Sequence, residues 1–347
     1  MCLINPMPTQ ISQIDRDRNF YLHTKKPLWD ITAIFYVLAG YCGAIALLLL
    51  PQIWLNVLGA VLLTHSLVLS AYLSHEFMHG TIFNERKWNA VGGNIMLWLN
   101  GGCYASFKDL AAEHILHHVK KIDSVAFDVP TFINNVPRLI RSLILVLEWS
   151  YFPAISFIIQ WRAVAAPFWN PQRHDERLRT IILLIVRSSL FILLGLVSLK
   201  ALILYFLAYI GMITVLRIVD CFQHTYETFL AGSYAPKRNS TYEQENTFTT
   251  LISRRYWWLN LLVLNFGYHN AHHALMRCPW YNLHKLDSDL FANRENYSLT
   301  LPQLLKNYHR FRVSRLVKGQ GKAVDGHGNL NLDAFYGAVG VSFLVKS

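Results

Sequence analysis

Two long runs without charged residues near the start of the sequence constrain the fold most strongly. Residues 31–50 and 53–73 contain no Asp, Glu, Lys or Arg, and only Pro51 and Gln52 separate them. A helix needs about 20 consecutive apolar residues to cross the hydrocarbon core of a bilayer. Because the connection is so short, we expect the two runs to form a tight transmembrane hairpin.

A second pair of apolar runs follows further along the chain. Residues 180–199 contain one charged residue, Arg187, residues 201–219 contain Arg217, and Lys200 lies between the two runs. Of all residues, 53% are hydrophobic and 15% are charged, whereas soluble proteins carry about a quarter charged residues. We therefore predict an all-α membrane protein whose two hairpins supply four transmembrane helices.

Two further apolar stretches are predicted not to cross the membrane fully. Residues 88–107 contain four glycines, and residues 139–161 are interrupted by Arg141, Glu148 and Pro153. Both are expected to be re-entrant or interfacial segments. The polar remainder is expected to form a helical cap.

Basic residues gather in the N-terminal arm, the middle connector and the C-terminal third, whereas the two hairpin turns contain only Lys200. The positive-inside rule therefore predicts a multi-pass protein with those three parts on the cytoplasmic side. We attribute the net charge of +11 to a membrane-facing surface, and expect no nucleic-acid binding. The predicted division is a cytoplasmic arm at 1–30, a membrane domain at 31–310 and a flexible, glycine-containing tail at 311–347.

Three histidine clusters lie outside the predicted spans. They are HxxxH at His75 and His79, HxxHH at His114, His117 and His118, and HxxHH at His269, His272 and His273. On a helix, positions i, i+3 and i+4 share one face. No single metal ion takes eight imidazoles, so the clusters predict a two-metal centre.

Asp220 and His224 follow the fourth run at a spacing of four residues, which would place them on one helix face. This spacing makes His224 a candidate ninth ligand. Glu76, Asn265 and Asn270 are candidates for supporting the ligands through hydrogen bonds.

Several functions are compatible with histidine ligands, since imidazole binds Fe, Zn, Cu and Ni. The first cluster also reads HExxH, as in zinc proteases, where the glutamate is the general base. That function leaves the two HxxHH clusters unexplained. A metal transporter would carry its ligands within the spans, near the midplane. A two-metal site under an apolar anchor favours oxidation of a long apolar substrate by O2, which requires a redox metal and points to iron.

The three clusters, in this order and with these intervening hairpins, resemble those of the membrane fatty acid desaturase superfamily over roughly residues 30–310. The resemblance implies a histidine-box di-iron oxidase with two iron ions (Fe2+/Fe3+) and O2 as co-substrate. His224 fits a further ligand that known members place before the third box. Asp220 stands where those members have Asn, which makes it a possible ligand.

The resemblance also implies the partners and the outcome. These are the lipid bilayer, a fatty acyl or other long apolar substrate, and a separate electron donor of the ferredoxin, rubredoxin or cytochrome b5 type. Fatty acyl desaturation is the expected reaction in lipid metabolism. Oxidative decarboxylation to a terminal alkene, or hydroxylation or ketolation of alkyl or carotenoid substrates, are the alternatives.

Overall fold

The computed structural model describes residues 20–22, 24–291, 297–327, 329–339 and 343–346. Its four longest helices are α2 (Pro27–Leu49), α3 (Ile53–His79), α9 (Arg177–Val197) and α10 (Leu199–Asp220). Within the described ranges, four helices are long and apolar enough to cross a membrane, and the third of these joins α9 to the short helix η2 (Pro171–Glu176) before it. The prediction of four helices of this kind is confirmed.

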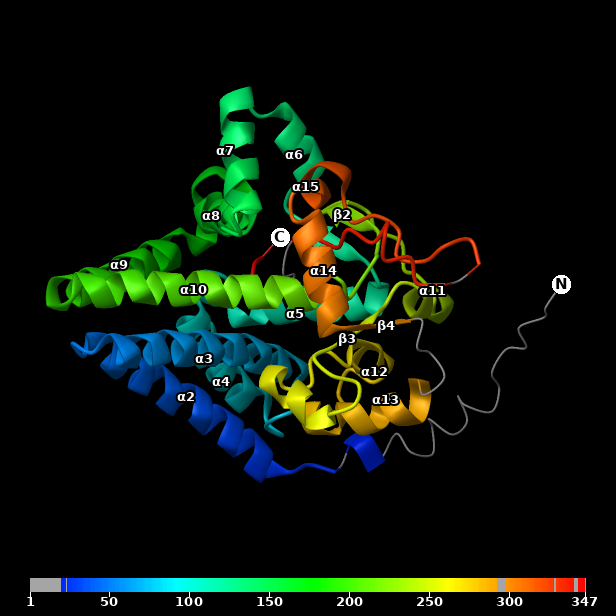
Figure 1. Cartoon of the computed structure of the whole chain (residues 1–347), viewed down its shortest axis with the longest axis horizontal. Helices are drawn as coiled ribbons and strands as arrows, with labels where there is room; N and C mark the ends of the chain where they lie inside the picture. The colour runs from blue at the N-terminus through cyan, green and yellow to red at the C-terminus, as the bar shows by residue number, and fades with distance from the viewer. Residues whose placement is uncertain (1–19, 23, 292–296, 328, 340–342, 347) are drawn as a thin grey trace.

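The hairpin turns follow from the residues at the helix ends. Pro51 ends the first helix of the α2–α3 pair, and the Asn56 side-chain amide donates hydrogen bonds to the Leu47 and Leu50 carbonyls, which closes the turn. In the α9–α10 pair, the Ser198 hydroxyl accepts a hydrogen bond from the first turn of α10, a common N-cap arrangement. Both turns lie at the same end of the molecule, on the left in Figure 1.

Shorter helices connect the two hairpins. They are α4 (Arg86–Asn100), η1 (Gly102–Tyr104), α5 (Phe107–Lys120), α6 (Val129–Asn135), α7 (Arg138–Trp149) and α8 (Ala154–Trp169). With 15 residues, α4 is too short for a full span. Helices α7 and α8 meet at 117°, so together they could form only a broken span.

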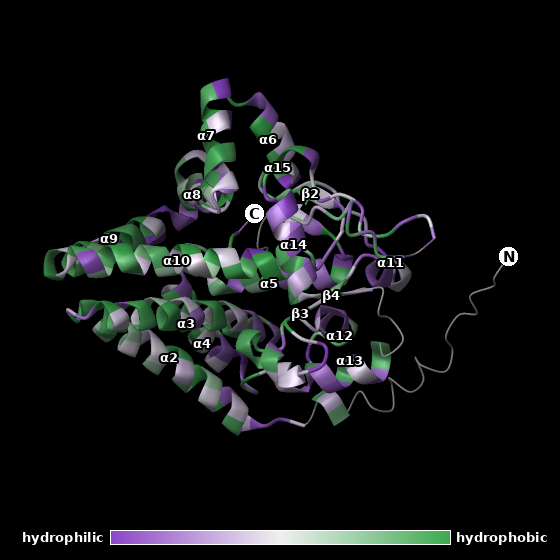
Figure 2. Ribbon diagram, viewed as in Figure 1, coloured by the Kyte–Doolittle hydropathy of each residue, from purple (hydrophilic) through white to green (hydrophobic). Residues whose placement is uncertain are grey.

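The polar cap lies at the end of the long helices opposite the hairpin turns (Figure 1). It contains α11 (Ser240–Glu245), η3 (Trp257–Val263), α12 (His269–Ala274), η4 (Trp280–Asn282), α13 (Leu283–Phe291), α14 (Leu301–Phe311) and α15 (Ser314–Lys318). Two small parallel sheets tie it together: β1 (Asp123–Val125) pairs with β2 (Thr228–Leu230), and β3 (Thr249–Leu251) pairs with β4 (Ser298–Thr300). Figure 2 shows the long helices rich in hydrophobic residues and the cap more hydrophilic.

The last part of the chain packs more closely than its glycine content suggested. Helix α15 lies within the expected tail, and the side chains of Leu316, Phe335 and Phe343 are buried. The described residues beyond 310 therefore form part of the packed structure rather than a loose tail. The division of the chain into three parts stays a prediction.

Candidate metal centre

The first histidine cluster sits at the last turn of α3. The helix ends at His79 because Gly80 adopts a left-handed conformation with φ of 67°, which glycine reaches without strain. His75 and His79 are one helical turn apart, and both are buried. The cluster therefore lies where the predicted second span meets the cap.

The second cluster is carried by α5. Its Ser106 side chain caps the helix start by accepting a hydrogen bond from the Asp109 backbone. His114 and His118, at i and i+4, point to one group of histidines, whereas His117 points to another. The helix therefore divides its three ligands between two sites.

The third cluster divides in the same way on α12. His272 joins the group that contains His114 and His118. His273 joins the group that contains His117, and the Nε2 atom of His269 lies 2.7 Å from that of His224 in the same group. Each HxxHH cluster thus gives its i and i+4 residues to one group and its i+3 residue to the other.

The first group contains five buried histidines whose candidate ligand atoms lie within 4.8 Å of one another: His75, His79, His114, His118 and His272. Their Nε2 atoms face each other, at 2.8 Å between His79 and His114 and 3.1 Å between His118 and His114. Two nitrogens on adjacent positions around one metal, each bound at about 2.1 Å, lie about 3 Å apart. The arrangement therefore fits a metal ion held by imidazoles.

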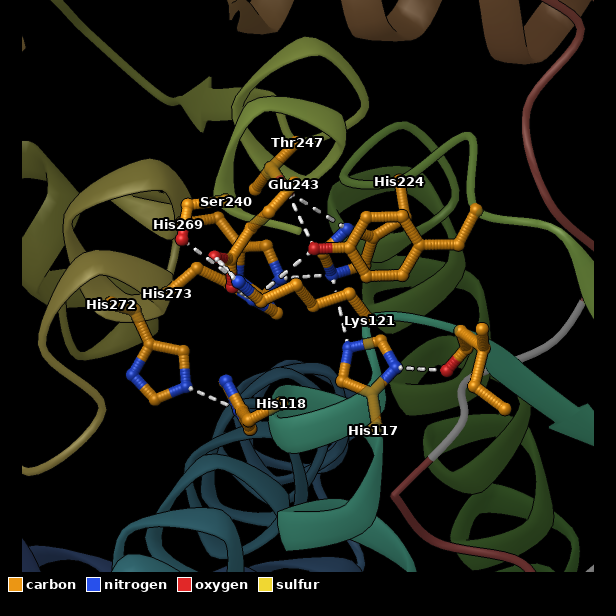
Figure 3. Close-up of polar contacts among 12 residues, drawn as sticks. His117, His118, Lys121, His224, Ser240, Glu243, Thr247, His269, His272 and His273 are labelled. Atoms are coloured by element: carbon orange, nitrogen blue, oxygen red, sulfur yellow. Dashed lines mark hydrogen bonds and ion pairs between the residues drawn. The ribbon is translucent and has the colours of Figure 1, made fainter. Parts of the chain in front are cut away.

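The second group, shown in Figure 3, contains His117, His224 and His273, with His269 beside them. The Nε2 atoms of His117 and His224 are 3.3 Å apart. The rings of His118 and His273 have centroids only 4.1 Å apart, so the two groups adjoin. The predicted convergence of all nine histidines is observed; their role as metal ligands stays a prediction.

His224 reaches this group by a route that the sequence pattern did not predict. Helix α10 ends at Asp220, and His224 lies beyond it, in an isolated bridge with Thr247. Asp220 and His224 therefore do not share a helix face. The shared-face prediction was wrong because the helix stops four residues too early.

Carboxylates contact the Nδ1 atoms of three histidines. Glu76 lies 3.2 Å from Nδ1 of His75, and Glu243 lies 3.3 Å from Nδ1 of His273 (Figure 3). Lys121 holds the other Glu243 oxygen at 2.7 Å. Such contacts orient a ligand ring and raise its basicity.

Asp123 plays the corresponding part for the third of these rings. Its carboxylate lies 3.1 Å from Nδ1 of His117, which also faces the Ile122 carbonyl at 2.9 Å. Sequence reasoning predicted a supporting role for Glu76 but missed Asp123 and Glu243. Neither residue belongs to a histidine motif: Asp123 begins β1 just after the end of α5, and Glu243 comes from the distant helix α11.

Burial favours the neutral form of six histidines in the two groups, because it lowers the pKa of each. Burial, reinforced by the charges of neighbouring imidazoles, lowers the pKa of His272 to about 3. The same causes hold the pKa well below its usual value for His114, His118, His224, His269 and His273. Neutral imidazole is the form that binds metals.

The other predicted supporting residues contact neighbouring segments rather than histidines. Asp220 accepts a hydrogen bond from the Tyr72 hydroxyl at 3.2 Å. The side-chain amide of Asn265 donates to the Trp280 carbonyl, and that of Asn270 donates to the Tyr297 carbonyl. One side-chain oxygen of each, Asp220 Oδ2, Asn265 Oδ1 and Asn270 Oδ1, is buried without a hydrogen-bond partner among the described residues. The supporting roles of these three residues stay predictions.

In a comparison with protein-family models, the sequence matches the family described as fatty acid desaturase over residues 52–304. The match covers more than half of the chain and all three histidine clusters. The chain belongs to the fatty acid desaturase family. No curated protein matches this desaturase-family chain in sequence. Family membership implies an oxidoreductase, and the histidine groups are consistent with a metal site in it.

Proposed function

We propose that this member of the desaturase family is an O2-dependent non-haem di-iron oxidase that introduces a double bond into a long fatty acyl chain. The observation that supports the proposal most strongly is the pair of adjoining histidine groups, five residues in one and four in the other, buried at the ends of apolar helices. Two redox ions in contact with a lipid-facing domain suit a reaction on an unactivated C–H bond.

The nine histidines would hold two iron ions, which supply the chemistry that activates O2 when electrons come from a separate donor protein. The chain itself would position the ions and exclude water. Phe266 and Phe343 lie against the His75 ring, with centroids at 4.8 and 5.5 Å. Tyr72 stacks on Phe266 at 4.4 Å. The Tyr72 and Phe266 rings form an apolar wall on one side of the first group, where an apolar substrate is favoured over water.

The HExxH motif does not favour hydrolysis in this arrangement. In a zinc protease the glutamate acts on a water molecule at the metal. Here Glu76 contacts Nδ1 of His75 and accepts a hydrogen bond from Thr81, whereas Nε2 of His75 faces His79. Glu76 therefore lies behind the ligand ring and suits a positioning role.

We further propose that the metal centre faces the cytoplasm. Both hairpin turns lie at the end of the molecule opposite the cap (Figure 1), and Lys200 is the only basic residue in them. The positive-inside rule then assigns the cap to the cytoplasmic side. Labelling of a cysteine introduced at exposed Tyr234 by a membrane-impermeant reagent should require opened cells; labelling in intact cells would place the cap outside.

The experiment is lipid and volatile profiling of a host that expresses the full chain. Unsaturated acyl chains absent from the empty host are expected, and the purified protein should contain close to two iron ions. New hydroxylated lipids or terminal alkenes, without new double bonds in the lipids, would replace desaturation by one of the alternative oxidations. One zinc ion, no iron and no oxidised product would refute the proposal.

A matched pair of variants makes the profile specific. His272→Ala removes a ring from the first group, and the new product should disappear while the protein still inserts. His327 is exposed and lies outside both groups, so His327→Ala should leave the product unchanged. Product formation by His272→Ala would show that the histidine groups are not the site of oxidation.

A further inference from the structure

The described residues 343–346 run past the first histidine group. The Phe343 side chain is only 3% exposed. Its ring centroid lies 5.5 Å from that of His75, 6.3 Å from that of His114 and 5.6 Å from that of Phe266. An apolar ring thus occupies the space directly beside the candidate ligands.

The next residues border three separate voids. Leu344 and Val345 line a cavity of about 60 Å³ whose other walls come chiefly from α8 and α10. Val345 and Lys346 line a larger cavity of about 310 Å³ beside β1. Leu344, Val345 and Lys346 together border a small void of about 20 Å³ near η1. One short segment therefore lies between spaces that would otherwise adjoin.

A polar anchor holds the end of this segment. The Lys346 ammonium group lies 2.8 Å from the Asp109 carboxylate on α5 and 2.7 Å from the Glu176 carboxylate on η2. The lysine side chain keeps 19% of its surface exposed. Contact with solvent weakens an ion pair relative to a fully buried one, so the anchor can open when a competing ligand is present.

We infer that residues 343–346 occupy part of the acyl-chain site and leave it when a substrate chain enters. The identity of that ligand rests on the proposed function. The segment presents three consecutive apolar side chains, and the walls around Leu344 and Val345 include Met212, Ile213 and Leu216 of the apolar helix α10. An alkyl chain would find the same apolar surroundings and the same proximity to the histidines.

A displaceable segment and a fixed wall differ in how substitution of Lys346 changes the affinity for substrate. If the segment competes with the substrate, weakening its anchor raises apparent affinity. If the seated form accounts for about nine-tenths of the molecules, freeing the segment increases apparent affinity about tenfold. A fixed wall would instead keep its place, and loss of the anchor would leave affinity unchanged or lower it.

The test is equilibrium binding of radiolabelled oleic acid to the purified full chain in nanodiscs, without an electron donor, so that no turnover occurs. Phe343→Ala and Lys346→Ala should each bind about tenfold more tightly than the original protein. Lys346→Arg, which preserves the two ion pairs, should match the original. So should Lys322→Ala, which removes an exposed lysine from the same part of the chain.

Unchanged or weaker binding by both Phe343→Ala and Lys346→Ala would overturn the inference. Melting temperatures identify a variant that fails to fold. In that case the affinity of the other variant, compared with that of Lys346→Arg, decides whether the segment competes with the fatty acid. A photoreactive fatty acid supplies a second readout, because adducts on α10 near Met212 should increase when the segment is released. Tighter binding without any oxidised product in the host would refute the proposed function and leave this inference standing. Oxidation with no effect of either substitution would refute this inference alone.

Discussion

Glu76 and Glu243 allow the two histidine groups to be perturbed separately. Glu243 contacts Nδ1 of His273 in the second group, and Glu76 contacts Nδ1 of His75 in the first. Removing a carboxylate that orients a metal-bound imidazole typically weakens metal binding about 10- to 100-fold. In free energy this is about 1.4 to 2.8 kcal/mol. Each substitution should therefore release one ion and spare the other.

The expected magnitudes differ between the two residues. Glu243→Gln keeps an acceptor for the His273 N–H but loses its charge and its ion pair with Lys121, so we expect a loss of about tenfold. Glu243→Ala removes the acceptor as well and should approach about 100-fold. Glu76→Gln acts on a group with five histidines rather than four, where the remaining rings retain the ion better.

Metal retention during dialysis against a graded chelator provides the assay. The original protein should lose its two ions at separate chelator concentrations. Glu243→Gln should move only one of these steps, and Glu76→Gln only the other. If either substitution weakened both ions equally, or if neither changed retention, the assignment of each carboxylate to its own group would be refuted.

Three further predictions concern stability, each measured by thermal or chemical unfolding in detergent. Burial raises the pKa of Asp287 to about 6. The protonated side chain is therefore tolerated below about pH 4, and stability is lost as the pH rises through 6 and the buried carboxyl ionises. Asp287→Asn should stabilise the protein by up to about 3 kcal/mol at pH 8 and have no effect at pH 4. Gly267→Ala should destabilise by about 1–3 kcal/mol because its Cβ would collide with a backbone carbonyl, whereas Gly43→Ala, in open space on a helix, should be neutral or stabilising. Arg217→Met leaves Glu148 as an unpaired buried charge and should cost about 3–5 kcal/mol, most of which Arg217→Met combined with Glu148→Gln should recover.

The apolar runs predicted the long helices well because their signal is local. A run without charges, ended by Pro51, needs no tertiary information to become a helix of membrane length. The boundaries shifted where other residues decide the ends. Helix α3 continues to His79, six residues past the apolar run, because its histidines gain partners on α5 and α12. The stop of α10 before His224 has no comparable local signal.

The HxxHH spacing predicted the convergence of the rings but not their division between two groups. On a helix, i and i+4 lie about 40° apart around the axis, whereas i+3 lies about 60° to the other side of i. The sequence alone gives these angular positions. They divide the rings between two metal groups only when other histidines approach the helix from each side. Helices α5 and α12 meet in that way, so that His117 and His272 leave their own cluster mates.

The charge of the centre explains why two of its three supporting carboxylates, Asp123 and Glu243, can lie outside the histidine motifs. Two divalent ions held by nine neutral imidazoles would bring four positive charges into a buried space, where unbalanced charge is costly. Glu76, Asp123 and Glu243 place three carboxylates one ring away, on the Nδ1 side of His75, His117 and His273. Carboxylates at that distance can offset charge without occupying coordination positions. They can therefore come from any segment that the fold brings near, so a motif of ligands reveals the metal site but only those supporting groups, such as Glu76, that lie within the motif itself.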